Sequence, residues 1–400
     1  MSAVSKVPSW LVVGIISLGW FTTANLLGDE KQADQQAAAE PAAKKSLFTL
    51  SRDTTRVMGP LRKDGTIDYV AALDAMASRG VTAENNAVVS LYEIIGPGEI
   101  LPELRTEYFK RLGITPLPVQ GNYFITLDQL VQRAVVGKNV SEKEFAKLDA
   151  QVRRKVFAAQ EKVWEQFDQA QGKSWTAREF PLLAEWLLVN QEPLKLLQQA
   201  SHRRRYYAPL ISSEEELPMV SVLLPGLVVY RELARALSIR ITMNMGQGKV
   251  AEVIADSLTC HRLGRLIGQG PFVIDSLVGI AIDSMACQAD VLAAHYGKLP
   301  PEKIKAWRQQ LQGLTPFPPI VERINVGERF SFLDSAFGIV RVGPSAFDQL
   351  AGEAGGEKGA FKGIVFKAWF NTVVDWDDVL RRGNRWYDEL VAVDRKLTYQ

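Results

Sequence analysis

The sequence predicts an all-α protein, either a multi-helix bundle or an irregular α-solenoid, that follows an N-terminal transmembrane or signal helix. Three observations support this prediction: capping and helix-breaking residues recur along the chain, apolar residues repeat at helical spacing in its centre, and an uncharged apolar segment lies near its start. Capping residues, glycine and proline mark helix ends, and short connections between helices favour antiparallel neighbours.

The N-terminal segment Trp10–Leu27 reads WLVVGIISLGWFTTANLL and contains no charged residue. A helix of this length rises about 27 Å, which is close to the thickness of the hydrocarbon core of a bilayer. We interpret residues 1–27 as an uncleaved membrane anchor. The alternative is a cleaved signal peptide, because the small residues Thr22 and Ala24 follow the apolar core at a spacing that suits cleavage.

Both interpretations place the rest of the chain outside the cytoplasm. It is either held at the cell membrane by a single-pass anchor or secreted or periplasmic after signal cleavage. Residues 28–45 are polar, rich in alanine and free of large apolar side chains, so we expect a flexible linker. The body that follows is divided into an N-terminal helical region, 46–210, and a C-terminal helical region, 211–400.

The body contains repeated signals for helices. Ser141 with Glu144, and Thr176 with Glu179, have the spacing of capping boxes. The first box predicts a long charged helix to about residue 170, and the second predicts the helix that contains FPLLAEWLLVN. In the C-terminal region the predicted helices span residues 228–245, 249–267, 272–296, 301–314 and 319–342, with a last one from about residue 375.

The helix predicted over residues 228–245 has an apolar and a polar face. The apolar stripe consists of Tyr230, Leu233, Ala234, Leu237 and Ile241, and the opposite face consists of Arg231, Arg235, Ser238 and Thr242. We therefore expect one side of this helix in the core and the other side in solvent.

Charge and cysteine content bear on several classes of protein. The 47 basic and 45 acidic residues nearly cancel, so nothing in the composition requires a nucleic-acid partner. Two cysteines cannot form a disulfide framework, and the sequence contains no CxxC, HExxH or CxxCH pattern. We therefore predict neither a cofactor nor a standard metal site.

The first candidate site is a cluster of ionisable residues on two predicted helices. Asp283 and Asp290 are seven residues apart and so lie on nearly the same helix face, and the preceding helix carries His261 and Arg265. Carboxylates that face a histidine and an arginine could form an acid–base or metal site. The alternative, which we favour, is an interhelical salt-bridge cluster that fixes the packing.

The two cysteines, Cys260 and Cys287, lie on the same pair of helices. If the turn between these helices centres near residue 270, Cys260 lies opposite residue 280, and Cys287 is about 10 Å further along the helix. A disulfide needs Cα atoms within about 7 Å of each other. We therefore expect buried free thiols.

A second candidate site is the basic and aromatic run HRRRYY, residues 202–207. Arg203, Arg204 and Arg205 could contact an anion such as a phosphate or a carboxylate, although local charge pairing around a loop is the favoured alternative. Residues 364–374, IVFKAWFNTVV, combine aromatic residues with lysine as in a membrane-interface contact. Aromatic residues at this spacing are more often part of a core.

Four segments of the body, residues 59–96, 179–210, 260–290 and 374–391, carry a family resemblance. In overall sequence style they resemble an uncharacterised family of envelope-associated helical proteins from planctomycete-type bacteria. The resemblance implies a helical body behind an N-terminal membrane segment. It carries over no catalytic residues, because we know of none assigned in proteins of this kind.

These observations together predict a membrane-tethered, non-catalytic helical protein of the bacterial cell envelope. Its N-terminal helix would hold it at the membrane, and its body would bind or organise a protein partner. One alternative is an envelope hydrolase or metal-dependent enzyme that uses Asp283, Asp290 and His261. The other is a lipid or small-ligand binder that uses a groove between helices.

Overall fold

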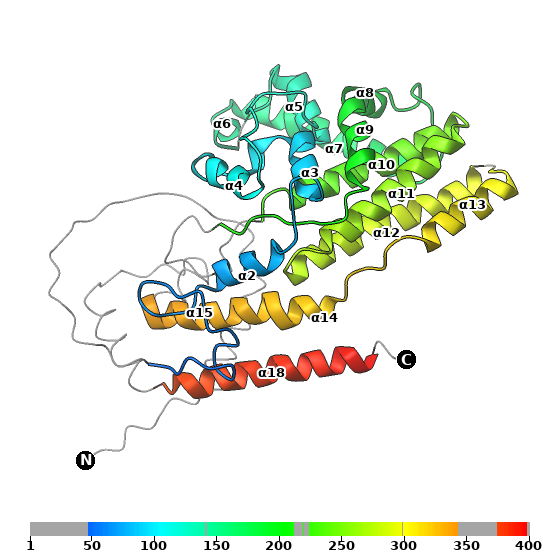
Figure 1. Ribbon diagram of the computed structural model, residues 1–400. Coiled ribbons are helices and arrows are strands. Elements are labelled where there is room, and N and C mark those ends of the chain that lie inside the picture. Colours follow the sequence, from blue (N-terminus) through cyan, green and yellow to red (C-terminus); the bar gives the residue numbers. More distant parts are fainter. Residues whose placement is uncertain are drawn as a thin grey trace, which may run out of the picture. The chain divides into compact units, whose positions relative to one another are not determined.

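The computed structural model describes residues 47–140, 142–211, 219, 224–297, 299–342 and 374–397. These residues form helices and connecting turns (Figure 1), and β-pairing among them is limited to two isolated bridges, Leu61–Ile67 and Asn86–Arg205. The prediction of an all-α protein is therefore confirmed. The predicted membrane helix in 1–27, the linker 28–45 and residues 351–373 lie outside the described residues.

The chain forms two compact units, each built from separated segments. Unit 1 comprises the described residues within 1–76, 210–223 and 320–400, and unit 2 comprises those within 77–209 and 224–319. This division crosses the boundary between residues 210 and 211 that the sequence analysis used. It does so because central helices from the second half of the chain pack against helices from the first half.

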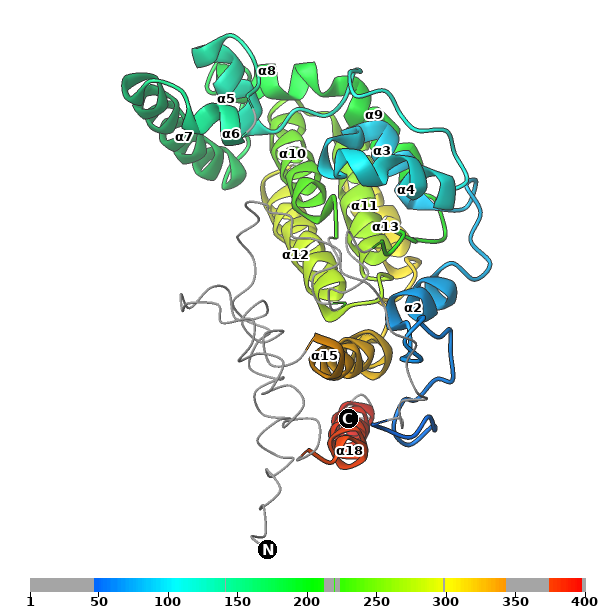
Figure 2. The same cartoon turned by 90° about the vertical axis from the view of Figure 1, so that its left-hand side faces the viewer.

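Unit 2 holds most of the helices. They are α3 Ala87–Ile95, α4 Arg105–Arg111, α5 Leu127–Val136, α6 Glu142–Ala146, α7 Ala150–Gln171, α8 Pro181–Val189, α9 Gln191–Ala200, α10 Leu227–Gly246, α11 Val250–Ile267, α12 Val273–Tyr296 and α13 Pro301–Gln312. Two short 3₁₀ turns, η2 Pro97–Glu99 and η3 Pro102–Leu104, precede α4. Helices α10, α11 and α12 lie side by side in both views (Figure 1, Figure 2) and pack most extensively on one another. Helices α10 to α13 begin and end within about two residues of their predicted bounds.

Helix α10 is buried beyond its predicted apolar face, although Arg231 of the opposite face is exposed. The predicted apolar stripe is fully buried, but Ser238 and Thr242 of the predicted polar face are buried as well. The expectation that these two residues face solvent is wrong, because α7 and α8 pack on α10 in addition to α11 and α12. The Thr242 hydroxyl accepts a hydrogen bond from Trp175 Nε1 at 3.0 Å, and the Ser238 hydroxyl donates to the carbonyl oxygen of Arg235 at 2.9 Å.

Two of the predicted helix starts lie elsewhere in the structure. The single helix expected from Ser141 to about residue 170 is instead α6 and α7, and α7 starts with its own N-cap, Asp149, whose carboxylate accepts from the amide of Gln151 at 2.7 Å. The amide of Thr176 donates to Glu179 Oε2 at 2.8 Å. This contact closes a turn, however, and α8 begins only at Pro181.

Glycines allow α11 and α12 to approach each other closely. A Cβ atom on Gly279 would lie 2.4 Å from the carbonyl oxygen of Gly264, and one on Gly264 would lie 2.6 Å from that of Gly279. Both distances are much shorter than a van der Waals contact, so any larger residue at either position would force the helices apart. This close contact sets the register that brings residues near 261 opposite residues near 283.

Unit 1 contains α2 Tyr69–Ala77, which ends at its boundary, α14 Ile320–Arg323, a π-helical turn η5 Ile324–Glu328, α15 Arg329–Val342 and α18 Trp376–Leu397. The helices predicted from 319 to 342 and from 375 are confirmed, with the π-turn inserted in the first. Two ion pairs here each involve one fully buried partner, Arg329 in the first and Asp334 in the second. Arg329 Nη2 lies 2.8 Å from Asp388 Oδ1, and Arg62 Nη2 lies 3.2 Å from Asp334 Oδ1.

Within the described part of the chain, α12 is the one helix long and apolar enough to cross a bilayer. One such helix is weak evidence, because the core helix of a soluble protein passes the same test of length and composition. Helix α12 packs against α10 and α11 and carries Asp275, Asp283 and Asp290. Carboxylates in a bilayer are costly, so we describe α12 as a member of the unit 2 bundle.

Candidate functional site

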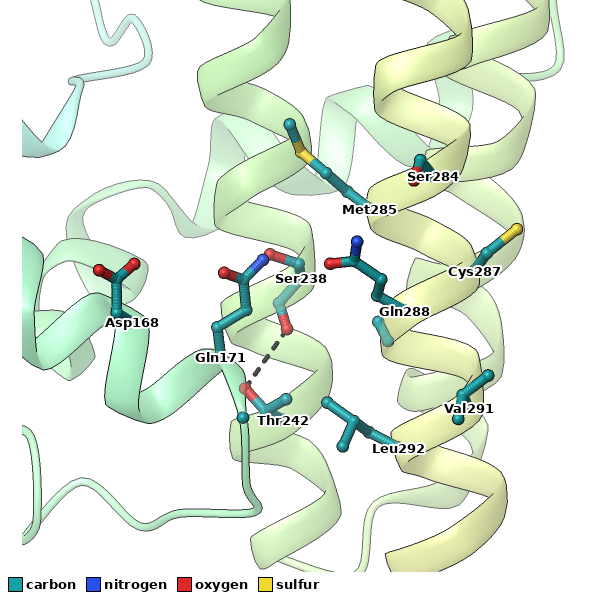
Figure 3. A pocket seen from close by; sticks show the side chains of 12 residues that line it. Asp168, Gln171, Ser238, Thr242, Ser284, Met285, Cys287, Gln288, Val291 and Leu292 are labelled. Atoms are coloured by element: carbon teal, nitrogen blue, oxygen red, sulfur yellow. Dashed lines mark hydrogen bonds between the residues drawn. The ribbon is translucent and has the colours of Figure 1, made fainter.

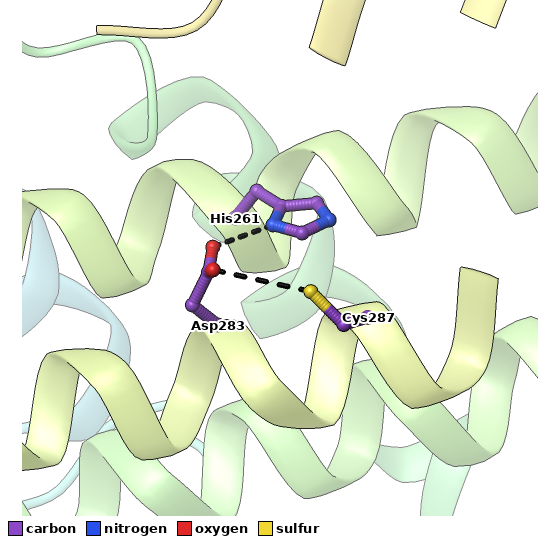
Figure 4. A group of neighbouring side chains, drawn as sticks. All are labelled: His261, Asp283 and Cys287. Carbon is purple, nitrogen blue, oxygen red and sulfur yellow. Dashed lines mark hydrogen bonds and ion pairs between the residues drawn. The ribbon is translucent and has the colours of Figure 1, made fainter. Parts of the chain in front are cut away.

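The candidate cluster predicted on α11 and α12 comes together around one histidine. His261 projects from α11, and its side chain is only 5% exposed. Its Nδ1 lies 2.5 Å from Asp283 Oδ1, and its Nε2 lies 2.9 Å from Asp290 Oδ2. Figure 4 shows the contact with Asp283 across the two helices. The imidazole therefore bridges two carboxylates that stand two helical turns apart on α12.

Arg265 extends the same network from α11. Its Nη1 donates to Asp283 Oδ1 at 2.5 Å and to the carbonyl oxygen of His261 at 3.0 Å. Its Nε donates to the carbonyl oxygen of Thr315 at 2.8 Å, and its guanidinium lies 5.1 Å from the ring centre of Phe317. Arg265 is thus held by a carboxylate, two carbonyl groups and an aromatic ring.

The charges in the cluster stabilise one another. Burial by itself lowers the pKa of His261, but the hydrogen bonds and negative charges of Asp283 and Asp290 outweigh it and raise the pKa to about 9. Burial raises the pKa of Asp283, but the hydrogen bonds and positive charges of His261 and Arg265 bring it below its ordinary value. At neutral pH the cluster is therefore an imidazolium and an arginine paired with ionised aspartate.

Cys287 stands beside this cluster on α12. Its Sγ lies 4.0 Å from Asp283 Oδ2 (Figure 4). Ligand atoms of His261, Asp283 and Cys287 all lie within 4.8 Å of one another, so these three residues could hold a metal ion. Imidazole, carboxylate and thiolate are all ligands that Zn²⁺ accepts. In that arrangement Asp290 would accept the other imidazole N–H and orient the ring.

The charge state of the cluster opposes this metal chemistry and also general-base catalysis. A metal ion would have to displace the His261 proton and compete with Arg265 for Asp283. A histidine that keeps its proton at neutral pH is a poor general base. Burial and the charges of the two aspartates raise the pKa of the Cys287 thiol, so the nucleophilic thiolate is disfavoured too. The arrangement is best suited to holding α11 against α12.

The two cysteines are free, as predicted, but they differ in exposure. Cys260 is buried and its S–H lies 3.6 Å from the carbonyl oxygen of Ile282, whereas Cys287 is exposed. The expectation that both thiols are buried is therefore wrong for Cys287. Cys287 lies beside the His261 cluster and lines a hollow that is open to solvent.

The basic run makes contacts through both its side chains and its backbone. Arg205 Nη2 donates to the carbonyl oxygen of Arg79 at 3.1 Å, and the carbonyl oxygen of Arg204 accepts from Gln269 Nε2 at 3.3 Å. Arg203 contributes a positive charge near Glu84. The backbone of this run is fixed by Asn86, whose side chain bonds both the amide and the carbonyl group of Tyr207. The anion contact predicted for Arg203, Arg204 and Arg205 stays a prediction.

A hollow of about 540 Å³ lies between the end of α7, α10 and α12 (Figure 3). Gln171 and Gln288 reach toward it from facing helices, and Asp168 is the one charged residue in its lining. The hydroxyl of Thr242 donates to the carbonyl oxygens of Ile239 and Ser238 at 3.0 and 3.3 Å.

Sequence reasoning missed a buried ion pair next to the cluster. Arg240 of α10 donates from Nε and Nη2 to the two carboxylate oxygens of Asp256 on α11, at 2.8 and 2.6 Å. Gln198 of α9 donates to the same carboxylate at 2.8 Å. Arg240 and Asp256 are sixteen residues apart in the sequence and lie on two different helices. Spacing within a single helix therefore does not reveal the pair.

Comparisons with known proteins found no match to this chain among protein-family models, curated proteins or solved structures.

Proposed function

We propose that this protein is a non-catalytic helical binding protein of the bacterial cell envelope, tethered to the membrane by its N-terminal segment. The observation that carries the proposal is the His261 network. Both ring nitrogens of His261 are bonded to carboxylates, and Arg265 occupies Asp283 as well. Among the described residues, this group of side chains most resembles a catalytic site. Its imidazole nitrogens, carboxylate oxygens and guanidinium are bonded to one another.

The remaining support comes from the sequence. The uncharged segment Trp10–Leu27 is long enough to span a bilayer, and the polar segment 28–45 would separate the helical body from the membrane. A helical body on a tether suits the binding or organisation of another envelope component. This localisation and the resemblance to envelope-associated helical proteins stay predictions.

The test is crosslinking in intact cells, followed by affinity purification from the membrane fraction and mass spectrometry. A binding protein predicts a reproducible, near-stoichiometric protein partner. It also predicts that Asp283→Asn, if circular dichroism shows the helical content unchanged, still captures that partner. Turnover of a small molecule that disappears in a folded Asp283→Asn variant would instead establish a catalytic role.

The proximity of His261, Asp283 and Cys287 supports a second candidate, a metal-dependent enzyme. This candidate predicts one equivalent of zinc per chain in protein purified without chelators, and its loss in Cys287→Ser. The proposed binding function predicts that zinc content does not differ between the wild type and Cys287→Ser.

A further inference from the structure

Unit 2 has a second groove, between α9, α11 and α13, that encloses about 690 Å³. This volume lies within the range of about 300–1,000 Å³ that is common for small-molecule sites. Its walls are mainly apolar, with Ile254 and Leu258 of α11 facing Trp307 of α13. The charged or ionisable residues of the lining are basic, and the lining includes no carboxylate.

The basic residue that matters most is Arg262, which is half-buried at the C-terminal end of the α11 wall. The neighbouring arginines of the bundle have acidic partners: Arg240 pairs with Asp256, and Arg265 pairs with Asp283. Arg262 has no carboxylate within ion-pair distance among the described residues. A guanidinium taken partly out of water without a counter-ion is unfavourable, so this position is suited to an incoming anion.

The side chain that Arg262 contacts belongs to another basic residue, His202. Arg262 Nη1 lies 3.5 Å from His202 Nε2. Burial and the charge of Arg262 lower the pKa of His202, so this imidazole is neutral at neutral pH. The pair therefore carries one positive charge and presents it at the groove.

The apolar part of the groove continues from this charge along one face of α11. Ala251, Ala255, Leu258 and Arg262 follow one another at spacings of three or four residues and all line the groove. The stripe is about 16 Å long. A charged group at Arg262 can therefore have an extended apolar chain beside it, between α11 and α13.

Trp307 forms the opposite wall and is itself 3% exposed. It packs into the apolar cluster that joins α10, α11, α12 and α13, so the wall that it forms is fixed. Its indole Nε1–H is buried with no hydrogen-bond partner in the described part of the chain. The groove is thus a preformed apolar slot with an unpaired positive charge at one end.

We propose that this groove binds a single-chain anionic amphiphile, with its carboxylate or phosphate at Arg262 and its acyl chain along the stripe from Leu258 to Ala251. This inference goes beyond the proposed binding of a protein partner. It is also independent of the His261 network, because neither His261 nor its carboxylate partners line this groove.

The test uses the full-length protein in nanodiscs of phosphatidylcholine and a photoactivatable diazirine analogue of dodecanoate, with labelled peptides located by mass spectrometry. We expect labelling within α9, α11 or α13 that excess dodecanoate or dodecyl phosphate suppresses. Arg262→Gln should reduce this labelling about tenfold or more, because a hydrogen-bonded charge contact is lost. Ala255→Trp should also reduce it, by filling the groove at an exposed helix position.

The matched control is Arg308→Gln, which removes an exposed arginine of α13 that does not line the groove. It should leave the labelling unchanged, and circular dichroism should show the same helical content in all variants. Three results would each overturn the proposal. They are full labelling in both Arg262→Gln and Ala255→Trp, competition by dodecanol equal to that by dodecanoate, and competition by inorganic phosphate alone, which would indicate a simple anion site.

Discussion

Replacing His261 by glutamine removes a proton that the folded protein is expected to hold more tightly than the unfolded chain. The ordinary pKa of histidine is 6.5, and the two aspartates raise that of His261 to about 9 despite its burial. Between these two values the folded state is protonated at His261 and the unfolded state is not. Stability therefore falls as pH rises through this interval.

The size of the effect follows from the two pKa values. Each pH unit between them corresponds to about 1.4 kcal/mol, so the full contribution is on the order of 3 kcal/mol. It is fully present below about pH 6.5 and is lost as pH rises through about 9. About 2 kcal/mol of it should disappear between pH 6 and pH 8.5, a range that ends before tyrosines ionise.

The assay is urea unfolding of the wild type and of His261→Gln at several values between pH 6 and pH 8.5, monitored by circular dichroism. The difference in unfolding free energy between the two proteins should shrink as pH rises. His295→Gln, which removes an exposed histidine at the C-terminal end of α12, serves as control and should show no such trend. A difference between wild type and His261→Gln that does not change with pH would refute the charged-histidine argument.

Three further substitutions or reagents test other parts of unit 2. Gly279→Val should lower the free energy of unfolding by about 1–3 kcal/mol or more, seen as a lower Tm, because its Cβ would lie 2.4 Å from the carbonyl oxygen of Gly264; an unchanged Tm would contradict the close packing of α11 and α12. Asp256→Ala should cost about 3–5 kcal/mol in urea unfolding, because it leaves Arg240 buried without its partner; a cost below about 1 kcal/mol would show that solvent reaches the arginine. Maleimide should modify Cys287 in the native protein, slowly because its thiol pKa is raised, and the second, buried cysteine only after unfolding; intact-mass measurement of two modified thiols in the native protein would contradict this.

Helix positions could be predicted well where local signals act alone. Gly268 to Pro271 separates α11 from α12, and both helices have the predicted bounds to within about a residue. Local signals predict the wrong helix start where a second N-cap residue follows the first along the chain. Asp149 caps α7 and so divides the helix that the capping box at Ser141 predicts as one.

Burial was harder to predict than helix position, because it depends on how many neighbours a helix has. Ser238 and Thr242 fall on the polar side of α10 by spacing, yet both are buried beneath other helices. Cys287 lies on the same helix as the buried Ala286 and Ala289, but it faces outward. A single helix pattern gives the most apolar face and does not show whether a second face is covered.

The cluster around His261 could be predicted because the connection between α11 and α12 is short. An antiparallel pair joined by a few residues has nearly one register, and the observed pair puts Cys260 opposite Ile282, two residues from the predicted position. That shift leaves Cys287 about 7.5 Å further along α12, which still places it poorly for a disulfide with Cys260. The sequence alone does not show that one imidazole spans both carboxylates. Asp283 and Asp290 are about 10 Å apart along the axis, and only the close approach at Gly264 and Gly279 lets the two ring nitrogens of His261 reach both.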